Sequence, residues 1–400
     1  MLKHNLPMRP TPEPDFRSLP VAEMEAILAR FDQRVDAAQS AGPPSKEWVK
    51  KAVRRQGTGR CPVWIKRLSL DIVLRYGDAL ADLFCQYPDD AVRVVPYDIF
   101  IGYQAPGREP RVNPVEALMR DAQWEDEWGT RWAHALGGVG ATPIDCPLKD
   151  WSQLDEYLAR CVPDPRAPGR FDAAAAVLKV HGQDRYCFGT IHLALFERLH
   201  ALRGMANVFT DFYTNPSEVR RLVDAIAAYT RELIRVWGDL GADAVFLTDD
   251  WGSQRALMIS PATWREFFKA HYAAMIAEAH RFGMDVIFHS CGNVTAIVED
   301  LIEVGMDVLD PVQPGAMDVD LLARRFGGKA SFCGAIDLQQ LLAHGTPQEV
   351  RDSVRRLIDT LGRPFGGGFI VSPANVLTPE IPLENLRALF ETSHQRHAQG

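Results

Sequence analysis

The chain has 400 residues, of which 46% are hydrophobic and 24% are charged, as in a globular protein with one large core or two modest ones. A formal net charge of −8 argues against nucleic acid or an anionic membrane surface as the partner. No run of about 18 apolar residues occurs and the start lacks the apolar segment of a signal peptide, so we expect a cytoplasmic protein with no membrane contact.

The first 58 residues are expected to form an N-terminal helical arm. After a proline-rich start, residues 21–32 carry apolar side chains at helical spacing, and Gly42-Pro-Pro ends the pattern. From residue 59 onward, short apolar runs alternate with amphipathic stretches. The change of pattern predicts that the main domain covers residues 59–400.

Eight short apolar runs in this domain have the composition of buried β-strands. They are residues 62–65, 92–97, 185–188, 243–248, 286–289, 307–310, 330–333 and 368–371. Helical stretches bounded by caps or breakers stand between most of them, for example residues 217–237 and 263–282. Eight strand–helix units in one chain predict an α/β protein with a parallel (β/α)8 barrel of the TIM type.

Residues 102–182 do not fit this alternation. They contain Trp124-Glu-Asp-Glu-Trp-Gly129 and a loop rich in proline and aspartate, with little periodicity. We expect an insertion that covers the mouth of the barrel, with Trp124 to Trp132 as a candidate lid.

The fifth apolar run ends with two potential metal ligands. Residues two apart in an extended segment point to the same face, so the imidazole of His289 and the thiol of Cys291 converge about 7 Å apart along the backbone. Such a pair is half of a catalytic zinc site, which normally has three protein ligands and an open position. The structural alternatives are a histidine bonded to a backbone carbonyl and a cysteine that is only a small buried side chain.

Polar side chains also follow six of the other predicted strands, at the end where barrel enzymes build their sites. They are Lys66 and Arg67, Asp98, Asp249 with Asp250 and Trp251, Asp310 with Gln313, Cys333 with Asp337, and Asn375. Structural roles are open for several of them. One of Asp249 and Asp250 could cap the following helix. Asp98 could form an ion pair with Arg67, and Cys333 could be a buried thiol without a ligand role.

Six motifs occur in an order typical of one superfamily. They are Pro62-Val-Trp-Ile65, Tyr97-Asp-Ile99, Asp249-Asp-Trp-Gly252, Phe288-His-Ser-Cys-Gly-Asn293, Gly334-Ala-Ile-Asp337 with Gly345-Thr-Pro-Gln-Glu-Val350, and Ser372-Pro-Ala-Asn-Val-Leu-Thr-Pro-Glu-Ile-Pro-Leu-Glu-Asn385. Together they resemble the uroporphyrinogen decarboxylase superfamily over residues 60–392. The resemblance implies a (β/α)8 barrel, in agreement with the strand count.

The superfamily contains two chemistries, and decarboxylation of a carboxylate-rich tetrapyrrole is the first. Its enzymes bind the substrate with an Arg-Gln-Ala-Gly-Arg-Tyr loop after the first strand. Arg67 matches the first arginine, but Asp71 stands at the second, where an acid would repel a substrate carboxylate. Asp98 matches the catalytic aspartate, whereas Asn375 stands where the decarboxylases carry a histidine.

The second chemistry is that of the zinc-dependent methyltransferases, which pass a methyl group between a corrinoid and a thiol. They use a His-x-Cys pair on the fifth strand and a cysteine on the eighth, and the metal lowers the pKa of the acceptor thiol. His289 and Cys291 match the pair, and Asn375 replaces the eighth-strand cysteine. The candidates for a third ligand are Asp250, Asp310, Cys333 and a substrate thiol.

The resemblance therefore favours a methyltransferase-like enzyme that acts on a small methylated compound or a methyl-corrinoid. In this hypothesis zinc is held by His289 and Cys291, with Cys333 as a further candidate. Asp98 and Asp250 position or protonate the substrate, and Arg67 holds a substrate anion. The residues expected to contact the substrate are Asp249, Trp251, Gln313 and Asn375.

The partners and two alternatives follow from the same resemblance. Nothing in the chain resembles a cobalamin-binding domain, so a separate corrinoid protein is the expected partner. One alternative is a decarboxylase of a carboxylated pyrrole that uses Asp98 and Arg67 without metal. The other is a non-catalytic corrinoid- or tetrapyrrole-binding protein, because Asn375 replaces a functional residue of both chemistries. The oligomeric state is open, with a homodimer as one option.

Overall fold

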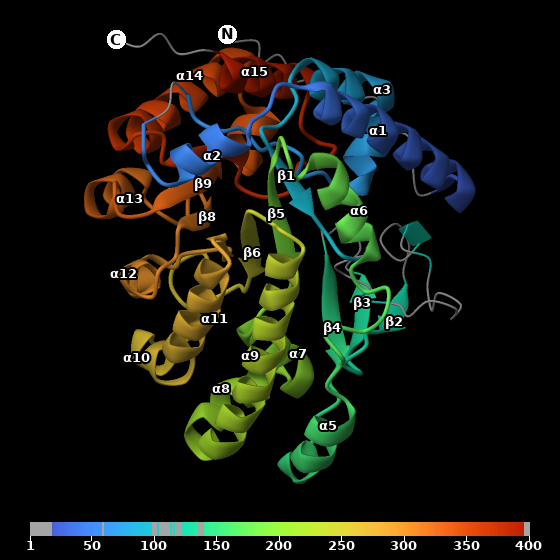
Figure 1. Ribbon diagram of the computed structural model, residues 1–400, viewed down its shortest axis with the longest axis vertical. Helices are drawn as coiled ribbons and strands as arrows, with labels where there is room; N and C mark the ends of the chain where they lie inside the picture. Colours follow the sequence, from blue (N-terminus) through green and yellow to red (C-terminus); the bar gives the residue numbers. More distant parts are fainter. Residues whose placement is uncertain are drawn as a thin grey trace, which may run out of the picture.

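The protein is described here by a computed structural model that covers residues 18–57, 60–97, 102–103, 113, 115–116, 122–134 and 140–395 (Figure 1). Its centre is a parallel sheet of seven strands in the order β1-β5-β6-β7-β8-β9-β10. The strands are β1 (Ala91–Val94), β5 (Tyr186–Ile191), β6 (Ala244–Thr248), β7 (Asp285–His289), β8 (Val308–Val312), β9 (Ser331–Ile336) and β10 (Phe369–Pro373).

An extended segment around Val63, the first of the predicted runs, takes the eighth strand position. It bridges β10 in parallel, with the Trp64 N–H 3.0 Å from the Val371 carbonyl and the Val371 N–H 2.8 Å from the Pro62 carbonyl. On its other side, the N–H of Asp90, just before β1, donates to the Val63 carbonyl at 2.9 Å. The sheet therefore curls back on itself, and the predicted (β/α)8 barrel is confirmed.

Helices follow the strands and surround the sheet (Figure 1). They are α3 (Leu70–Gln86) after the Val63 segment, α7 (Phe196–Arg203), α8 (Met205–Thr214) and α9 (Pro216–Asp239) after β5, α10 (Pro261–Trp264) and α11 (Ala270–Arg281) after β6, and α12 (Val298–Glu303), α13 (Val319–Phe326), α14 (Pro347–Leu357) and α15 (Leu383–His394) after β7 to β10. The predicted helices at residues 217–237 and 263–282 are present, and a π-helical turn at Arg265–Lys269 joins the two parts of the second. Within the described ranges, no helix combines the length and apolarity that crossing a bilayer requires.

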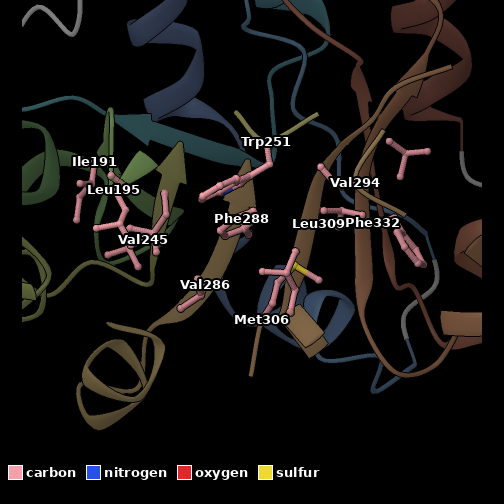
Figure 2. Packing of buried hydrophobic residues seen from close by; sticks show 14 of the residues in the cluster. Ile191, Leu195, Val245, Trp251, Val286, Phe288, Val294, Met306, Leu309 and Phe332 are labelled. Carbon is pink, nitrogen blue, oxygen red and sulfur yellow. The ribbon is translucent and has the colours of Figure 1, made fainter. Parts of the chain in front are cut away.

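The strands are apolar on both faces because one face packs on helices and the other fills the barrel. Figure 2 shows part of the helix-facing layer, in which Val245 and Phe288 are fully buried. The opposite faces contribute a second cluster inside the barrel. Its members include Trp64, Tyr186, Phe188, Phe246, Ile287, Val308, Cys333 and Ile370. The side chains beneath the site are thus large, buried and closely packed.

One of the N-terminal helices covers the end of the barrel where the strands begin, and the other packs outside it. α2 (Lys46–Val53) places Val49 and Val53 in the inner cluster. Lys50 forms an ion pair with Asp243, immediately before β6, at 2.7 Å. α1 (Val21–Ala41) packs along α3. The opposite end of the barrel, where the strands finish, is left for the functional site.

Residues 102–182 include a small antiparallel sheet with strand order β2-β3-β4. The strands of this sheet are β2 (Gln123–Glu125), β3 (Arg131–His134) and β4 (Ala141–Asp145). The same segment of the chain also contains the helices α5 (Leu154–Arg160) and α6 (Asp172–His181). Trp128, in the turn between β2 and β3, is buried, and its carbonyl accepts a hydrogen bond from the Tyr157 hydroxyl at 2.7 Å. The role of this segment as a lid stays a prediction.

Candidate active site

The strands of the barrel end at a cavity of about 350 Å³. Five of the ten predicted site residues line it, namely Arg67, Asp250, His289, Cys291 and Asn375. Residues 102–182 contribute Trp128, Trp132 and Pro143 to the same cavity. The cavity therefore lies between the barrel and this segment. The expectation that site residues follow the strands is met by half of the predicted set.

Among the described residues, one group of at least three side chains brings metal-ligating atoms together. In this group, one ligating atom from each of Asp250, His289 and Cys291 lies within 4.8 Å of the others. The His289 Nε2 is 3.5 Å from the Cys291 Sγ and 3.8 Å from the Asp250 Oδ1. Carboxylate, imidazole and thiolate are the donors of catalytic zinc sites, and three protein ligands beside a cavity allow an open position. The donor set fits zinc.

Asp310 orients the imidazole of His289 for this role. The His289 Nδ1 lies 2.7 Å from the Asp310 Oδ1, and an ionised carboxylate accepts a hydrogen bond from the Nδ1–H group. The lone pair of Nε2 is then free on the side of Cys291 and Asp250. A carboxylate behind the ligating histidine is the usual support of zinc-binding imidazoles. Asp310, one of the candidate third ligands, thus lies behind the histidine, while Asp250 lies beside it.

Arg67 balances the charge of Asp310. Its Nη2 is 2.5 Å from both carboxylate oxygens, and its guanidinium lies 4.0 Å from the centroid of the Trp64 ring. Burial raises the pKa of Asp310, but the attraction of Arg67 and the hydrogen bond from His289 outweigh burial and hold that pKa below its usual range. The expectation that Arg67 holds a substrate anion stays a prediction, and the ion pair means that its charge already has a buried partner.

The loop that carries Cys291 is fixed from three sides. The Cys291 N–H donates to the Asp250 Oδ1 at 2.8 Å, and the Gly292 N–H donates to the Gln313 Oε1 at 2.7 Å. Gly292 has a φ of +78°, and a Cβ there would lie 2.4 Å from the backbone of Gly252, so only glycine is accommodated. Gln313 therefore supports the loop rather than lining the cavity.

The thiol of Cys291 is influenced by the acids Asp250 and Asp310 and by the amide of Asn375. The Asn375 Nδ2 lies 3.5 Å from the Cys291 Sγ, within reach of a sulfur hydrogen bond. Burial, followed by the charges of Asp250 and Asp310, raises the pKa of this thiol. A bound cation acts in the opposite direction and favours the thiolate.

Asp249 and Trp251 do not line the cavity, so the expected substrate contacts are corrected for both. Asp249 is fully buried and accepts the N–H groups of Phe196 at 2.9 Å and Glu197 at 2.7 Å, as well as the Tyr272 hydroxyl. It caps α7, which precedes it in the chain, instead of the following helix. Trp251 stacks on Phe196 with ring centroids 4.1 Å apart, and Figure 2 shows it in the packed layer.

One of the predicted ligands does not join the group of possible ligands among the described residues. Cys333 is fully buried inside the barrel, and its thiol is not part of the metal-ligating group. The structure thus gives its ligand role no support. Asp98 lies outside the described residues, so its role as a catalytic acid stays a prediction.

Sequence reasoning missed several charged or titratable residues that line the cavity, among them Arg93, Glu197, Arg198 and His200. Glu197 and His200 lie on α7, where burial and then Asp250 raise the pKa of Glu197 well above its usual value. Burial lowers the pKa of His200 to about 4. Both side chains therefore favour the neutral form. The i, i+3 spacing of Glu197 and His200 could have indicated that both lie on one face of a helix. The site residues were expected at strand ends, however, and α7 starts after a loop.

Comparisons of the sequence support one family. The family model described as uroporphyrinogen decarboxylase (URO-D) matches residues 194–396, just over half of the chain. A uroporphyrinogen decarboxylase of Pseudomonas fluorescens is 30% identical over 195 residues, which cover 47% of this chain and 51% of the relative. One of Legionella pneumophila is 25% identical over 365 residues, covering 86% of this chain and 95% of the relative. A methylated-thiol–coenzyme M methyltransferase of Methanosarcina mazei is 26% identical over 187 residues, 47% of each chain. The match to several of the relatives thus spans only about half of their length.

A solved structure shares the fold. A methyltransferase from Methanosarcina mazei superposes with a TM-score of 0.64 at 16% sequence identity, covering 88% of this chain and 98% of the other. At that identity the likeness concerns the fold alone. The region matched by the family model contains strands β6 to β10 together with Asp250, His289 and Cys291. The predicted resemblance is confirmed, and the chain belongs to the uroporphyrinogen decarboxylase family.

Proposed function

We propose that this protein is a zinc-dependent, methyltransferase-like enzyme that moves a methyl group between a small methylated compound or a corrinoid and a thiol. The observation that carries the proposal is the group of Asp250, His289 and Cys291 on the wall of the cavity. The relative named methylated-thiol–coenzyme M methyltransferase supports the same class of chemistry. A separate corrinoid protein would supply the corrinoid.

Asp250, His289 and Cys291 would hold the zinc ion. Asp250 takes the place of the third ligand, which the asparagine at position 375 left open in the sequence. Its carboxylate lies on the cavity side of the strand end and is 37% exposed, so it is accessible to an ion. When bound, zinc supplies a positive charge that favours the thiolate form of an acceptor thiol.

The surrounding residues of the chain hold protons and orient groups. Asp310 keeps the proton of His289 on Nδ1, and Arg67 keeps Asp310 ionised. Glu197 favours its neutral form beside Asp250, so its carboxyl group can donate a hydrogen bond to a substrate atom. Asp98 is retained as a candidate acid.

The size of the cavity bears on the choice between the two chemistries of the family. Small-molecule sites span about 300–1,000 Å³. A cavity of about 350 Å³ therefore favours a small methylated compound over a tetrapyrrole. Decarboxylation of a carboxylated pyrrole is the second candidate, because relatives of that name match the chain. It has less support because Arg67 is already paired with Asp310.

Elemental analysis of protein purified without chelator tests the proposal. About one zinc per chain is expected in the wild type, lost in a His289→Ala, Cys291→Ala double variant. A Cys85→Ala, His344→Ala double variant is the matched control, because both of its side chains are exposed elsewhere on the molecule. Demethylation of methylcobalamin in the presence of a thiol, followed by the corrinoid absorption, then measures turnover. Zinc-free wild-type protein without such turnover would reject the proposal.

A further inference from the structure

Three arginines of the described part of the chain line the cavity, and two of them already have a counter-ion. Arg67 pairs with Asp310 at 2.5 Å. Arg198 pairs with Asp126 at 2.6 Å. Arg93 differs, because no carboxylate forms an ion pair with it in the part of the chain that the structure describes.

The side chain of Arg93 is held so that one edge of the guanidinium stays available. Its Nε donates to the Thr190 Oγ1 on the neighbouring strand β5 at 3.0 Å. The guanidinium carbon lies 5.3 Å from the centroid of the Phe246 ring, which belongs to the inner cluster of the barrel. Thr190 therefore occupies Nε, and no residue in the described ranges hydrogen-bonds the two terminal nitrogens, which leaves them for a ligand in the cavity. Two parallel N–H donors match the two oxygens of a carboxylate.

The electrostatic surroundings favour an anion at this place. Burial, and then the positive charge of Arg67, lowers the pKa of Arg93 to about 10. The side chain stays protonated at neutral pH, but its charge is less stable than in water. A negative group in the cavity would relieve that cost, and the ligand would gain a charge-assisted hydrogen bond.

We propose that Arg93 is an anion-binding residue of this cavity and that its ligand is a small organic molecule with a single carboxylate group. Among the described residues of the cavity, one arginine without an ion pair matches one negative charge, whereas a phosphate dianion would bring a second charge near Asp250. The inference rests on the proposed function in one respect only. The ligand would be the methylated substrate, because the possible zinc ligands line the same cavity of about 350 Å³.

Isothermal titration with matched carboxylates and amides tests the proposal. The probes are acetate and acetamide, propionate and propionamide, and methylthioacetate and methylthioacetamide. At least one carboxylate is expected to bind the wild type about tenfold or more tightly than its amide, as for a hydrogen bond to a charged group. Arg93→Gln should abolish this preference. Arg93→Lys should keep part of it, because lysine keeps the charge but lacks the two parallel N–H donors of arginine. Arg131→Gln, on an exposed arginine of β3, is the control.

Several outcomes would overturn the proposal. Wild-type protein that binds no carboxylate more tightly than its amide, or none of the six probes, would contradict it. A preference that persists in Arg93→Gln would assign the anion to another residue. Tighter binding of inorganic phosphate than of propionate would reject the single-carboxylate class. Should Arg93→Gln fail to fold, the Arg93→Lys variant provides the test. A carboxylate preference equal to that of the wild type would then contradict recognition by the paired N–H donors of Arg93.

The same titrations on the His289→Ala, Cys291→Ala variant separate this proposal from the zinc proposal. A carboxylate could bind zinc directly, so the variant lacking two of the three proposed ligands removes that source of affinity. The carboxylate preference is expected to persist there, independent of the metal. Its loss together with the zinc would overturn the Arg93 subsite and leave the zinc proposal standing.

Discussion

At the residue scale, the candidate site depends on a row of buried groups whose charges balance. Arg67 is 6% exposed and Asp310 is fully buried, and Asp310 in turn holds His289. A buried charge is tolerated only while its partner is present, so each member of the row stabilises the next. Changes to the middle member should therefore be felt by both neighbours.

Replacement of Asp310 by asparagine preserves shape but removes the charge. We expect Asp310→Asn to lower the free energy of unfolding by about 3–5 kcal/mol, because Arg67 is left buried without a counter-ion. Zinc affinity should fall about 10–100-fold, because His289 loses its orienting partner. Urea unfolding of metal-free protein and zinc titration against a chelator measure the two effects. Asp352→Asn, on the exposed face of α14, is the control, and unchanged zinc affinity would limit Asp310 to a structural role.

His200 predicts an acid-dependent loss of stability. Its pKa is lowered by burial from 6.5 to about 4 in the folded protein. Between these values the unfolded chain binds more protons than the folded one, so stability is lost as the pH falls through this range. His200→Gln should flatten the dependence of unfolding free energy on pH by up to about 1.4 kcal/mol per pH unit. Urea unfolding across that range, with His344→Gln as the exposed control, decides; an unchanged slope would show that another group titrates.

At the scale of elements, the end of β6 places two neighbouring acids in different surroundings. Asp249 and Asp250 are neighbours, yet Asp249 is fully buried against α7 and Asp250 is 37% exposed in the cavity. Successive residues of an extended segment point to opposite faces, so one carboxylate meets the helix layer and the other meets the mouth of the barrel. Adjacent identical residues thus differ in burial and in the groups they contact.

The same isosteric change at the two positions should have opposite effects. Asp249→Asn is expected to cost about 2 kcal/mol of stability, because an amide cannot accept all the hydrogen bonds from α7 and Tyr272. Its zinc affinity should be close to that of the wild type. Asp250→Asn should lose zinc affinity with little change in stability. Unfolding and zinc titration of both variants test this, and a reversed pattern would exchange the two roles.

At the scale of the whole molecule, the two ends of the barrel do different work. The ring of helices closes where Phe84 of α3 meets Phe390 of α15 with ring centroids 4.8 Å apart, and Figure 1 shows α15 beside α3. α2 packs on the end where the strands begin, while the cavity lies where they finish. Residues at the first end should therefore affect stability alone.

Truncation of the α2 contact tests this division. A Val49→Ala, Val53→Ala double variant removes four side-chain carbon atoms from the inner cluster and should lower the free energy of unfolding by about 3 kcal/mol. Zinc content should not change, because the possible ligands lie at the opposite end. Val180→Ala, on a side chain that is 65% exposed, is the control. A loss of zinc in the double variant would show that the two ends are coupled.

Particular residues show which parts of the candidate site could be predicted from the sequence. The i, i+2 spacing of His289 and Cys291 correctly placed both on one wall, because strand periodicity is local. It could not tell which of Asp249 and Asp250 faces the cavity, since the strand end alone does not set that direction. Glu197 escaped because it follows a loop, and Arg93 because it lies within a strand rather than after it.

The sequence by itself determined the alternation of strands and helices, the family and two of the possible ligands, since all of these depend on local pattern and motif order. Only the tertiary structure decided that Asp250 joins the ligand group, that Arg67 is already neutralised and that Arg93 is not paired within the described chain. The physical reason is distance along the chain. Arg67 and Asp310 are 243 residues apart, and closure of the barrel, not any local preference, brings their charges together.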